Sequence, residues 1–319
     1  MSDPTNTEIA AALDELGDLS ELDGAIIHRV VAYRNAAKAV RDAPVSVSAL
    51  ARQGKATELP GIGSVIQEKV IALADEGVIP ATAKLRAKFP VGLLEMIRLP
   101  GLGPKRARRL YDELSIDSLQ ALTAAAEAQQ IRTLKGFGPK AEESLLAMAT
   151  AALAEAADGD GGGSGRMVLS RALAVGEQLV AALREHPASD RVELAGSARR
   201  MTDSVKDLDV IATAHDPLAL AKAAAALELV ESAQTPGEAG VRLRTHTGLK
   251  VDLRIVAPDQ FGNLMQHFTG SKEHNMALRD AAVRKGLHVS EYGLLDDSTG
   301  RTHRCEREQQ VYELLGLDY

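Results

Sequence analysis

Residues 194–211 read LAGSARRMTDSVKDLDVI, and this stretch decides the fold of the second half of the chain. Asp207 and Asp209 alternate with Leu208 and Val210, a period of two that predicts a half-buried strand. The two carboxylates would then share one face of the strand while the apolar residues face a core. A Gly196-Ser197 turn stands shortly before them.

A third strand-borne carboxylate follows in residues 249–256, LKVDLRIV, where Lys250, Asp252 and Arg254 share the polar face. If the two strands are neighbours, three carboxylates converge, and they repel one another unless a cation lies among them. Hard carboxylate oxygens suit Mg²⁺. Two such ions about 4 Å apart can stabilise both the attacking and the leaving oxygen of a phosphoryl transfer. The alternative is a solvated strand face.

The turn before the strand adds a second part to this pattern. Gly196 and Ser197 would supply backbone N–H and hydroxyl donors to a triphosphate, and Arg200 would add positive charge.

Composition limits the classes of protein. The chain has 319 residues, 45% hydrophobic and 25% charged, with 3% aromatic residues and no Trp, so its cores must be aliphatic. No apolar stretch approaches the 18 residues of a membrane span. The single cysteine, Cys305, excludes an intrachain disulfide and a multi-Cys zinc site. No signal peptide is visible at the N-terminus, so we expect a cytoplasmic protein.

Charge is unevenly distributed. The net charge is −7, but from Arg29 to Pro90 there are ten Lys and Arg against five Asp and Glu. A basic segment inside an acidic chain is typical of a nucleic-acid contact, and a solvated helical surface is the alternative.

A short motif recurs three times in the N-terminal half: residues 59–63 read LPGIG, residues 99–105 LPGLGPK and residues 134–140 LKGFGPK. Each copy follows an apolar helical stretch and precedes another. A Gly-x-Gly turn leading into a helix N-terminus presents free N–H groups that can bind a phosphate without regard to the base. The alternative is a helix–helix turn that needs glycine only for its backbone. A dinucleotide-binding fingerprint is excluded, because no strand precedes the turns and its third glycine is missing.

These patterns predict an all-α N-terminal half and an α/β (α+β) C-terminal half. Five of the eight residues in 158–165 are Gly, which predicts a linker. Beyond it we expect a helix over 166–185 and a helix over 217–230 with Asp216 as its cap. Antiparallel pairing is favoured over a regular βαβ series. The expected divisions are 1–90, 91–157, 158–165, 166–259 and 260–319, the last with helices over 275–286 and 308–315.

The repeated turns resemble the helix-hairpin-helix motif of DNA repair proteins. The resemblance implies nonspecific contact of Gly61, Gly63, Gly101, Gly103 and Lys105 with the DNA backbone. It also implies a monovalent cation, Na⁺ or K⁺, held by hairpin carbonyls. Whether the third copy touches DNA or is only scaffold stays open.

From about residue 8 to the end, the order of motifs resembles that of the family X DNA polymerases, which have a nucleotidyltransferase palm and a nucleotide-binding C-terminal subdomain. Residues 267–279, HFTGSKEHNMALR, complete the match. The resemblance implies that Asp207 and Asp209 hold two Mg²⁺ ions, for which Mn²⁺ can substitute. Asp252 would bind the catalytic ion and help to activate the primer 3′-hydroxyl.

The same resemblance gives roles to further residues. His267 and Phe268 would discriminate the sugar, Gly270 and Ser271 would form a turn, and Asn275 would read the minor-groove edge of the incoming base. Arg166 would contact the triphosphate, Lys250 the primer end and Arg279 the template strand, while Arg254 would pair with a catalytic carboxylate in the inactive state. The alternatives are solvated charges for Arg166 and Lys250, a helix cap for Asn275 and a core position for Phe268. Two departures from the family are Lys206, where a glycine is usual, and the His-Phe pair, which is Tyr-Phe in vertebrate relatives.

Residues 28–34 and 59–69 resemble the small lyase domain of polymerase beta-like enzymes. Lys69 matches the Schiff-base nucleophile that removes a 5′-deoxyribose phosphate, which requires an unprotonated amine. Two matched phosphate-binding lysines are replaced by Thr57 and Val65, and a third by Arg29. The alternative for Lys69 is a surface lysine.

We therefore expect a monomeric, DNA-directed DNA polymerase of the cytoplasm and nucleoid that binds gapped or primer-template DNA and a dNTP and fills short gaps during repair. The alternatives are a noncatalytic helix-hairpin-helix DNA-binding protein and a template-independent or RNA-directed nucleotidyltransferase. Long bacterial relatives continue past a Leu-Gly-Leu-x-Tyr ending into a metal-dependent phosphoesterase (PHP) domain. This sequence stops at residues 315–319, LGLDY, so 3′→5′ exonuclease activity is not expected of it.

Overall fold

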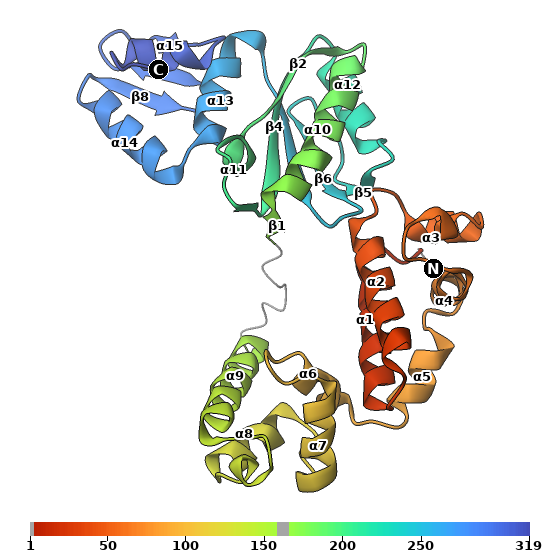
Figure 1. Ribbon diagram of the computed structural model, residues 1–319. Coiled ribbons are helices and arrows are strands. Elements are labelled where there is room, and N and C mark those ends of the chain that lie inside the picture. Colours follow the sequence, from red (N-terminus) through yellow and green to blue (C-terminus); the bar gives the residue numbers. More distant parts are fainter. Residues whose placement is uncertain (1–2, 158–165) are drawn as a thin grey trace. The chain divides into compact units, whose positions relative to one another are not determined.

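The structure, a computed structural model, describes residues 3–157 and 166–319. The chain forms two compact units whose boundary falls at residues 163 and 164. The predicted linker, residues 158–165, lies outside the described residues. Each unit is considered separately below (Figure 1).

The described part of the N-terminal unit contains helices and no strands. Its helices are α1 (Asn6–Leu22), α2 (Ile27–Asp42), α3 (Val47–Arg52), α4 (Ser64–Glu76), α5 (Pro80–Arg86), α6 (Val91–Ile97), α7 (Pro104–Leu114), α8 (Leu119–Glu127) and α9 (Pro139–Ala157), with 3₁₀ turns η1 (Ala56–Glu58) and η2 (Ile131–Thr133). A capping box of Thr5 and Glu8 fixes the start of α1.

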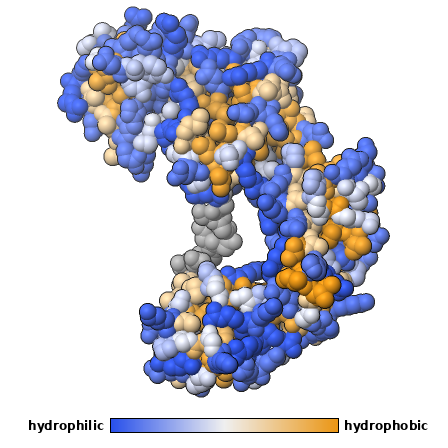
Figure 2. Space-filling view, in the orientation of Figure 1, coloured by the Kyte–Doolittle hydropathy of each residue, from blue (hydrophilic) through white to orange (hydrophobic). Residues whose placement is uncertain are grey.

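Two aliphatic cores hold these helices. One gathers residues of α1–α5, including Ile9, Leu13 and Val70, and the other gathers residues of α6–α9 around Leu110 and Leu122. Helix α1 contributes to both, since Leu19 and Leu22 belong to the second core. Figure 2 shows hydrophilic residues over most of the visible surface, with hydrophobic patches, one of them on the body formed by α1–α5.

A five-stranded mixed sheet organises the C-terminal unit. Its order is β2 (Ser189–Leu194), β4 (Asp207–Ala214), β7 (Lys250–Ile255), β6 (Gly240–Thr245) and β5 (Val230–Ala233). Strands β4 and β7 pair in parallel and the other three pairs are antiparallel. Helices α10 (Leu169–Glu185) and α12 (Pro217–Ala225) pack on one face of the sheet, over a core that includes Leu208, Val210 and Leu253.

A smaller module completes this unit. It consists of η3 (Pro258–Gln260), α13 (Phe261–Thr269), α14 (Lys272–Val283), α15 (Glu308–Leu314) and the antiparallel strands β8 (Leu287–Ser290), β9 (Gly293–Asp296) and β10 (Thr302–His303). Helix α13 joins the module to the large sheet, because Phe261, Leu264 and Met265 form one buried cluster with Ile211 of β4. Ile211 lies on the same strand face as Asp207 and Asp209.

Several expected boundaries were wrong. The helix expected over 166–185 begins at Leu169, because Met167 and Val168 form strand β1 against β3 (Ser204–Val205). The helix expected over 217–230 ends at Ala225, since Val230 begins β5. The helix expected over 275–286 lies over 272–283, where the Ser271 side chain accepts a hydrogen bond from the His274 N–H at 3.4 Å.

The expected cap of the helix after Asp216 was correct. Asp216 caps α12 by accepting a hydrogen bond from the Ala219 N–H at 3.0 Å. No helix among the described residues is both long and apolar enough to cross a membrane.

Candidate active site

The parallel pairing of β4 with β7 brings the three predicted carboxylates onto one sheet face. In its register Asp209 lies opposite Asp252, and Asp207 lies opposite Lys250. The residues that alternate with them, Leu208, Val251 and Leu253, are buried on the other face. The sequence alternation thus places the carboxylates outside the core.

Asp209 has a raised pKa, because it is largely buried and lies near two other carboxylates. Burial, followed by the neighbouring carboxylates of Asp207 and Asp252, raises the pKa of Asp209 from 3.8 to about 6, while Arg200 and Arg254 act in the opposite direction. A carboxyl with this pKa shares its site with other negative charge, which is the situation that a bound cation relieves.

Asp252 is engaged by two arginines. Arg254 Nε lies 3.1 Å from Oδ1 of Asp252, an ion pair rather than an aligned hydrogen bond, and Arg242 Nε lies 3.6 Å from Oδ2. In this arrangement no three His, Cys, Asp or Glu side chains of the described residues are grouped so that they could hold a metal ion. The observed state of Asp252 is therefore a neutralised one.

The residue types nevertheless fit a divalent cation. Three carboxylates on adjacent strands offer only hard oxygen ligands, which suit Mg²⁺ and exclude a soft thiolate site. After burial, the neighbouring carboxylates of Asp207 and Asp252 are the next causes of the raised pKa of Asp209, and a cation among them would offset that repulsion. Asp207, Asp209 and Asp252 are thus chemically suited to the ions, although arginines contact both carboxylate oxygens of Asp252.

The Gly196-Ser197 turn packs directly on Asp209. Gly196 has φ +63, and a Cβ there would lie 2.0 Å from Oδ2 of Asp209. The Ala195 N–H donates to the Asp209 carbonyl at 2.8 Å. Only glycine fits both the backbone conformation and this close approach. Helix α11 (Gly196–Arg199) then begins beside the carboxylates.

The two arginines predicted to contact the triphosphate make backbone contacts here. Arg166 donates from Nε to Ser204 Oγ at 2.9 Å and from Nη2 to the Ser204 carbonyl. Arg200 donates to the Thr269 carbonyl at the end of α13, and its charge lowers the pKa of Asp209. Arg200 thus lies within electrostatic reach of the carboxylates.

The segment 267–279 lies at the end of α13 and along α14. The pKa of His267 is lowered by burial, although Glu291 Oε2 lies 3.4 Å from its Nε2. Asn275 donates to the His267 carbonyl at 2.7 Å and accepts from Gln266 at 2.8 Å. Asn275 lies inside α14, so the helix-cap alternative is wrong.

The remaining residues of the segment lie nearby. Phe268 packs partly buried against the α13 cluster, and the Arg254 guanidinium lies 5.7 Å from its ring centre. Gly270 has φ +61, and a Cβ there would lie 3.4 Å from Arg200 Nη1. The positive charge of Arg279 reaches His267 and helps to lower its pKa.

The three hairpins of the N-terminal unit have the same hydrogen bonds. The residue between the glycines, Ile62, Leu102 or Phe137, is buried and donates from its N–H to the preceding leucine carbonyl at 3.0–3.1 Å. The first glycine is left-handed in each copy: φ is +93 at Gly61, +79 at Gly101 and +90 at Gly136. The second glycine accepts the first helical hydrogen bonds of α4, α7 or α9.

That second glycine faces open space in every copy. A Cβ at Gly63, Gly103 or Gly138 would meet no described atom within 4 Å, and none of the three has a left-handed backbone. The fold itself therefore does not require glycine there. Lys105 and Lys140 are exposed in the first turns of α7 and α9.

The third hairpin is fastened to the helix of the second. Arg109 of α7 donates to the Lys135 carbonyl at 2.8 Å, and Arg106 and Arg109 lie 4.4 and 5.8 Å from the Phe137 ring centre. The second and third hairpins are therefore held together through α7.

Lys69, the predicted lyase residue, is half-buried on α4, and its Nζ lies 6.0 Å from the ring centre of Tyr33. The lyase activity stays a prediction.

Sequence reasoning missed Arg242. It stands in β6, where Val241, Leu243 and Thr245 are buried and Arg242 and Arg244 are exposed. This alternation is visible in the sequence, but the partner of Arg242 follows only from the register that sets it opposite Asp252.

Comparison with known families supports this picture. Residues 4–79 match a helix-hairpin-helix domain, residues 93–149 match a SAM-like helix-hairpin-helix tandem, and residues 264–319 match the DNA polymerase beta thumb. With the mixed sheet between them, these parts define the class of fold: helix-hairpin-helix repeats followed by an α/β unit that ends in a polymerase beta-like thumb. The fold class expected from the sequence is thus confirmed.

A relative narrows the class. The chain is 32% identical over 312 residues to the DNA polymerase/3'-5' exonuclease PolX of Bacillus subtilis (strain 168). The match covers 97% of this chain and 53% of the relative, so the chain spans about half the length of that protein. The chain belongs to the family X DNA polymerases.

Proposed function

We propose that this protein is a DNA-directed DNA polymerase that adds deoxynucleotides to a primer 3′-hydroxyl in short gaps during DNA repair. The observation that carries the proposal is the placement of Asp209 opposite Asp252, with Asp207 on the same face, beside the Gly196-Ser197 turn. The family membership supports the same reaction.

Asp207, Asp209 and Asp252 would hold two divalent cations, which when bound would stabilise charge on the attacking and leaving oxygens of the transfer. Asp252 would lie beside the primer 3′-hydroxyl and help to draw off its proton. The donors of Gly196 and Ser197 would orient the triphosphate, and Arg166 and Arg200 would offset its charge. Asn275 and His267 would border the incoming nucleotide, and Lys250 and Arg279 would contact the DNA strands.

The hairpins would supply nonspecific affinity for DNA. Their exposed main-chain N–H groups at helix N-termini suit phosphate oxygens, and the open glycines would allow close approach of a sugar-phosphate backbone. A Na⁺ or K⁺ ion at the hairpin carbonyls would be part of the same contact.

Primer extension on a DNA substrate with a one-nucleotide gap tests the proposal. We expect incorporation of the templated nucleotide, dependent on Mg²⁺ or Mn²⁺, and loss of incorporation in Asp252→Ala with gapped-DNA binding retained. Incorporation that survives Asp252→Ala would refute the role of this carboxylate. Salt-sensitive DNA binding without any incorporation would instead favour a noncatalytic DNA-binding protein.

A further inference from the structure

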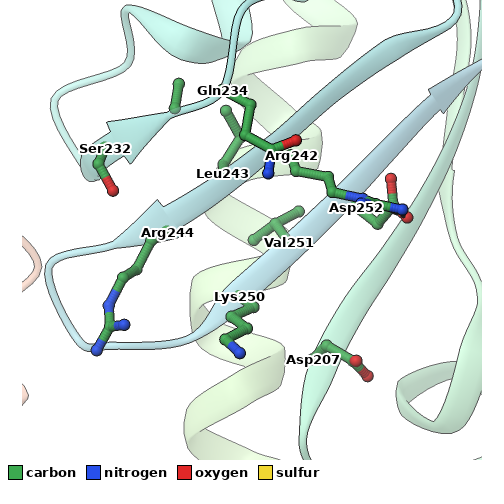
Figure 3. A pocket seen from close by; sticks show the side chains of 10 residues that line it. Asp207, Ser232, Gln234, Arg242, Leu243, Arg244, Lys250, Val251 and Asp252 are labelled. Atoms are coloured by element: carbon green, nitrogen blue, oxygen red, sulfur yellow. Dashed lines mark ion pairs between the residues drawn. The ribbon is translucent and has the colours of Figure 1, made fainter.

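A groove of about 580 Å³ runs along β5, β6 and β7 next to the carboxylates. Figure 3 shows its walls, with Arg242, Arg244 and Lys250 along two strands and Asp207 and Asp252 at one side. Three positively charged side chains thus line the groove beside two of the carboxylates proposed to be catalytic. The groove lies within the C-terminal unit, on the sheet face opposite α10 and α12.

The register orders these charges. Arg242 lies opposite Asp252, and Arg244 lies opposite Lys250, in the antiparallel pair β6–β7. Their strand neighbours Leu243 and Val251 are buried, so the charged residues form the exposed face. A row of cations on an exposed face that leads to the carboxylates is complementary to the backbone of a nucleic-acid strand whose end lies at those carboxylates.

Arg242 and Arg244 differ in what they contact. Arg242 Nε lies 3.6 Å from Asp252 Oδ2, whereas Arg244 Nε lies 3.2 Å from Oε2 of Glu231. Figure 3 shows the Arg242 side chain reaching to Asp252 and the Arg244 side chain extending away from it. The side chain of Arg242 is 62% exposed, so its ion pair with Asp252 is weak and can be exchanged at small cost.

We propose that Arg242 exchanges partners when DNA binds. In the DNA-free protein Arg242, together with Arg254, neutralises Asp252. When a primer strand enters the groove, Arg242 moves to a backbone phosphate beside Arg244 and Lys250, and one oxygen of Asp252 becomes available to a divalent cation. Arg242 is thus a positioning residue that couples DNA binding to metal binding, and this inference rests on the proposed polymerase function.

Such coupling is reciprocal and can be measured without catalysis. The experiment titrates Mn²⁺ into the full-length protein by electron paramagnetic resonance, free and bound to gapped DNA with a dideoxy-terminated primer, with the Mn²⁺ bound by DNA alone subtracted. DNA affinity is measured by fluorescence anisotropy in EDTA over a range of salt concentrations.

Arg242→Gln is the test variant, Arg242→Lys keeps the charge, and Arg244→Gln is the matched control on the same strand face. In Arg242→Gln we expect Mn²⁺ to bind the free protein about 5-fold more tightly, because an exposed ion pair of up to ~1 kcal/mol is lost. DNA binding should weaken, with a salt slope smaller by about 1. The tightening of Mn²⁺ by DNA should be smaller than in the wild type.

Arg244→Gln should weaken DNA binding with the same salt signature and leave Mn²⁺ binding to the free protein unchanged. Equal Mn²⁺ affinities of the wild type and Arg242→Gln would overturn the proposal. An equal gain in Arg244→Gln would also overturn it, since that result would reflect net charge alone. Because every readout is binding, failure of primer extension would count against the proposed function and leave this inference to its own test.

Discussion

The hairpins and the carboxylate face differ in how complete they are without a ligand. The hairpins repeat one set of hydrogen bonds three times and leave each second glycine facing open space. On the carboxylate face, by contrast, Asp252 is paired with two arginines and the described acids form no group that could hold a metal. One region is preformed and the other must rearrange.

The cause lies in the kind of group that each region uses. Main-chain N–H groups at a helix N-terminus carry only partial charge and are fixed by the helix, so they keep the same position with or without a ligand. Full carboxylate charges on adjacent strands repel, and in this structure two arginines offset the charge of Asp252. The comparison predicts that substitutions in the hairpins will weaken DNA binding, whereas substitutions on the carboxylate face will lower the rate of incorporation.

The largest effect should come from Asp207→Asn. If Asp207 helps to hold both ions, as we propose, its loss removes several kcal/mol of transition-state stabilisation, and the single-turnover rate of incorporation should fall on the order of 10³-fold. Binding of gapped DNA, measured by anisotropy, should change less than about 2-fold, because in the proposed function the hairpins supply that affinity. Asp203→Asn, an exposed neighbour, is the control and should keep full activity. A matching loss of DNA affinity in Asp207→Asn would contradict the separation.

Next in size should be Gly196→Ala. The left-handed backbone and the overlap with Asp209 together should cost roughly 3–5 kcal/mol, which lowers Tm by about 10 °C. Incorporation should fall as well, because the turn and Asp209 must move apart. Gly237→Ala is the matched control, since a Cβ there meets no described atom within 4 Å. An unchanged Tm in Gly196→Ala would show that the close packing of turn on carboxylate is wrong.

Asp209→Asn should stabilise the fold at neutral pH. The pKa of Asp209 is about 6 in the folded protein against 3.8 as the ordinary value, so the native state holds more protons than the unfolded state between these pH values. Stability is therefore lost as the pH rises through this window, and the full cost of about 2–3 kcal/mol is present at pH 7.

The asparagine variant escapes this cost. Urea unfolding in EDTA should show it more stable than the wild type at pH 7 and equal to it near pH 4. A gain of the same size at both pH values would mean that the charge of Asp209 is not the cause.

The smallest effects should come from the second glycines of the hairpins. In Gly103→Ser and Gly138→Ser the new serine is a good helix N-cap, but its side chain fills the open space beside the hairpin. Each variant should bind DNA about 5-fold more weakly, near 1 kcal/mol, with Tm unchanged. Gly136→Ser, at φ +90, should instead lower Tm. If Gly138→Ser binds DNA like the wild type, the third hairpin is only scaffold.

Much of the fold could be predicted from local sequence patterns. The alternation around Asp207 and Asp209 correctly separated the carboxylate face from the core, and the Gly-x-Gly turns correctly separated the helices. The helix expected after Pro217 was longer than the observed one. The Ala-rich run and Leu227–Val230 are both apolar, and an apolar run fits a helix or a strand equally well. Only pairing with β6 makes Val230 a strand residue.

Contacts between distant strands could not be predicted. The parallel pairing of β4 with β7 was a condition in the sequence argument and became an observation only with the register. The arginine partners of Asp252 depend on that register and on side-chain reach. For the same reason Arg242 looked like any exposed arginine.

Strand β4 has two tasks that lie close together. In the proposed function Asp209 holds the divalent cations, and Ile211, about 7 Å further along the same face, anchors α13 through Phe261, Leu264 and Met265. A substitution in that apolar cluster is therefore expected to change turnover as well as folding. A change of side-chain shape in the cluster would shift β4 and with it the position of Asp209 relative to Asp252. This would happen although none of the three α13 side chains is a predicted contact of nucleotide or DNA.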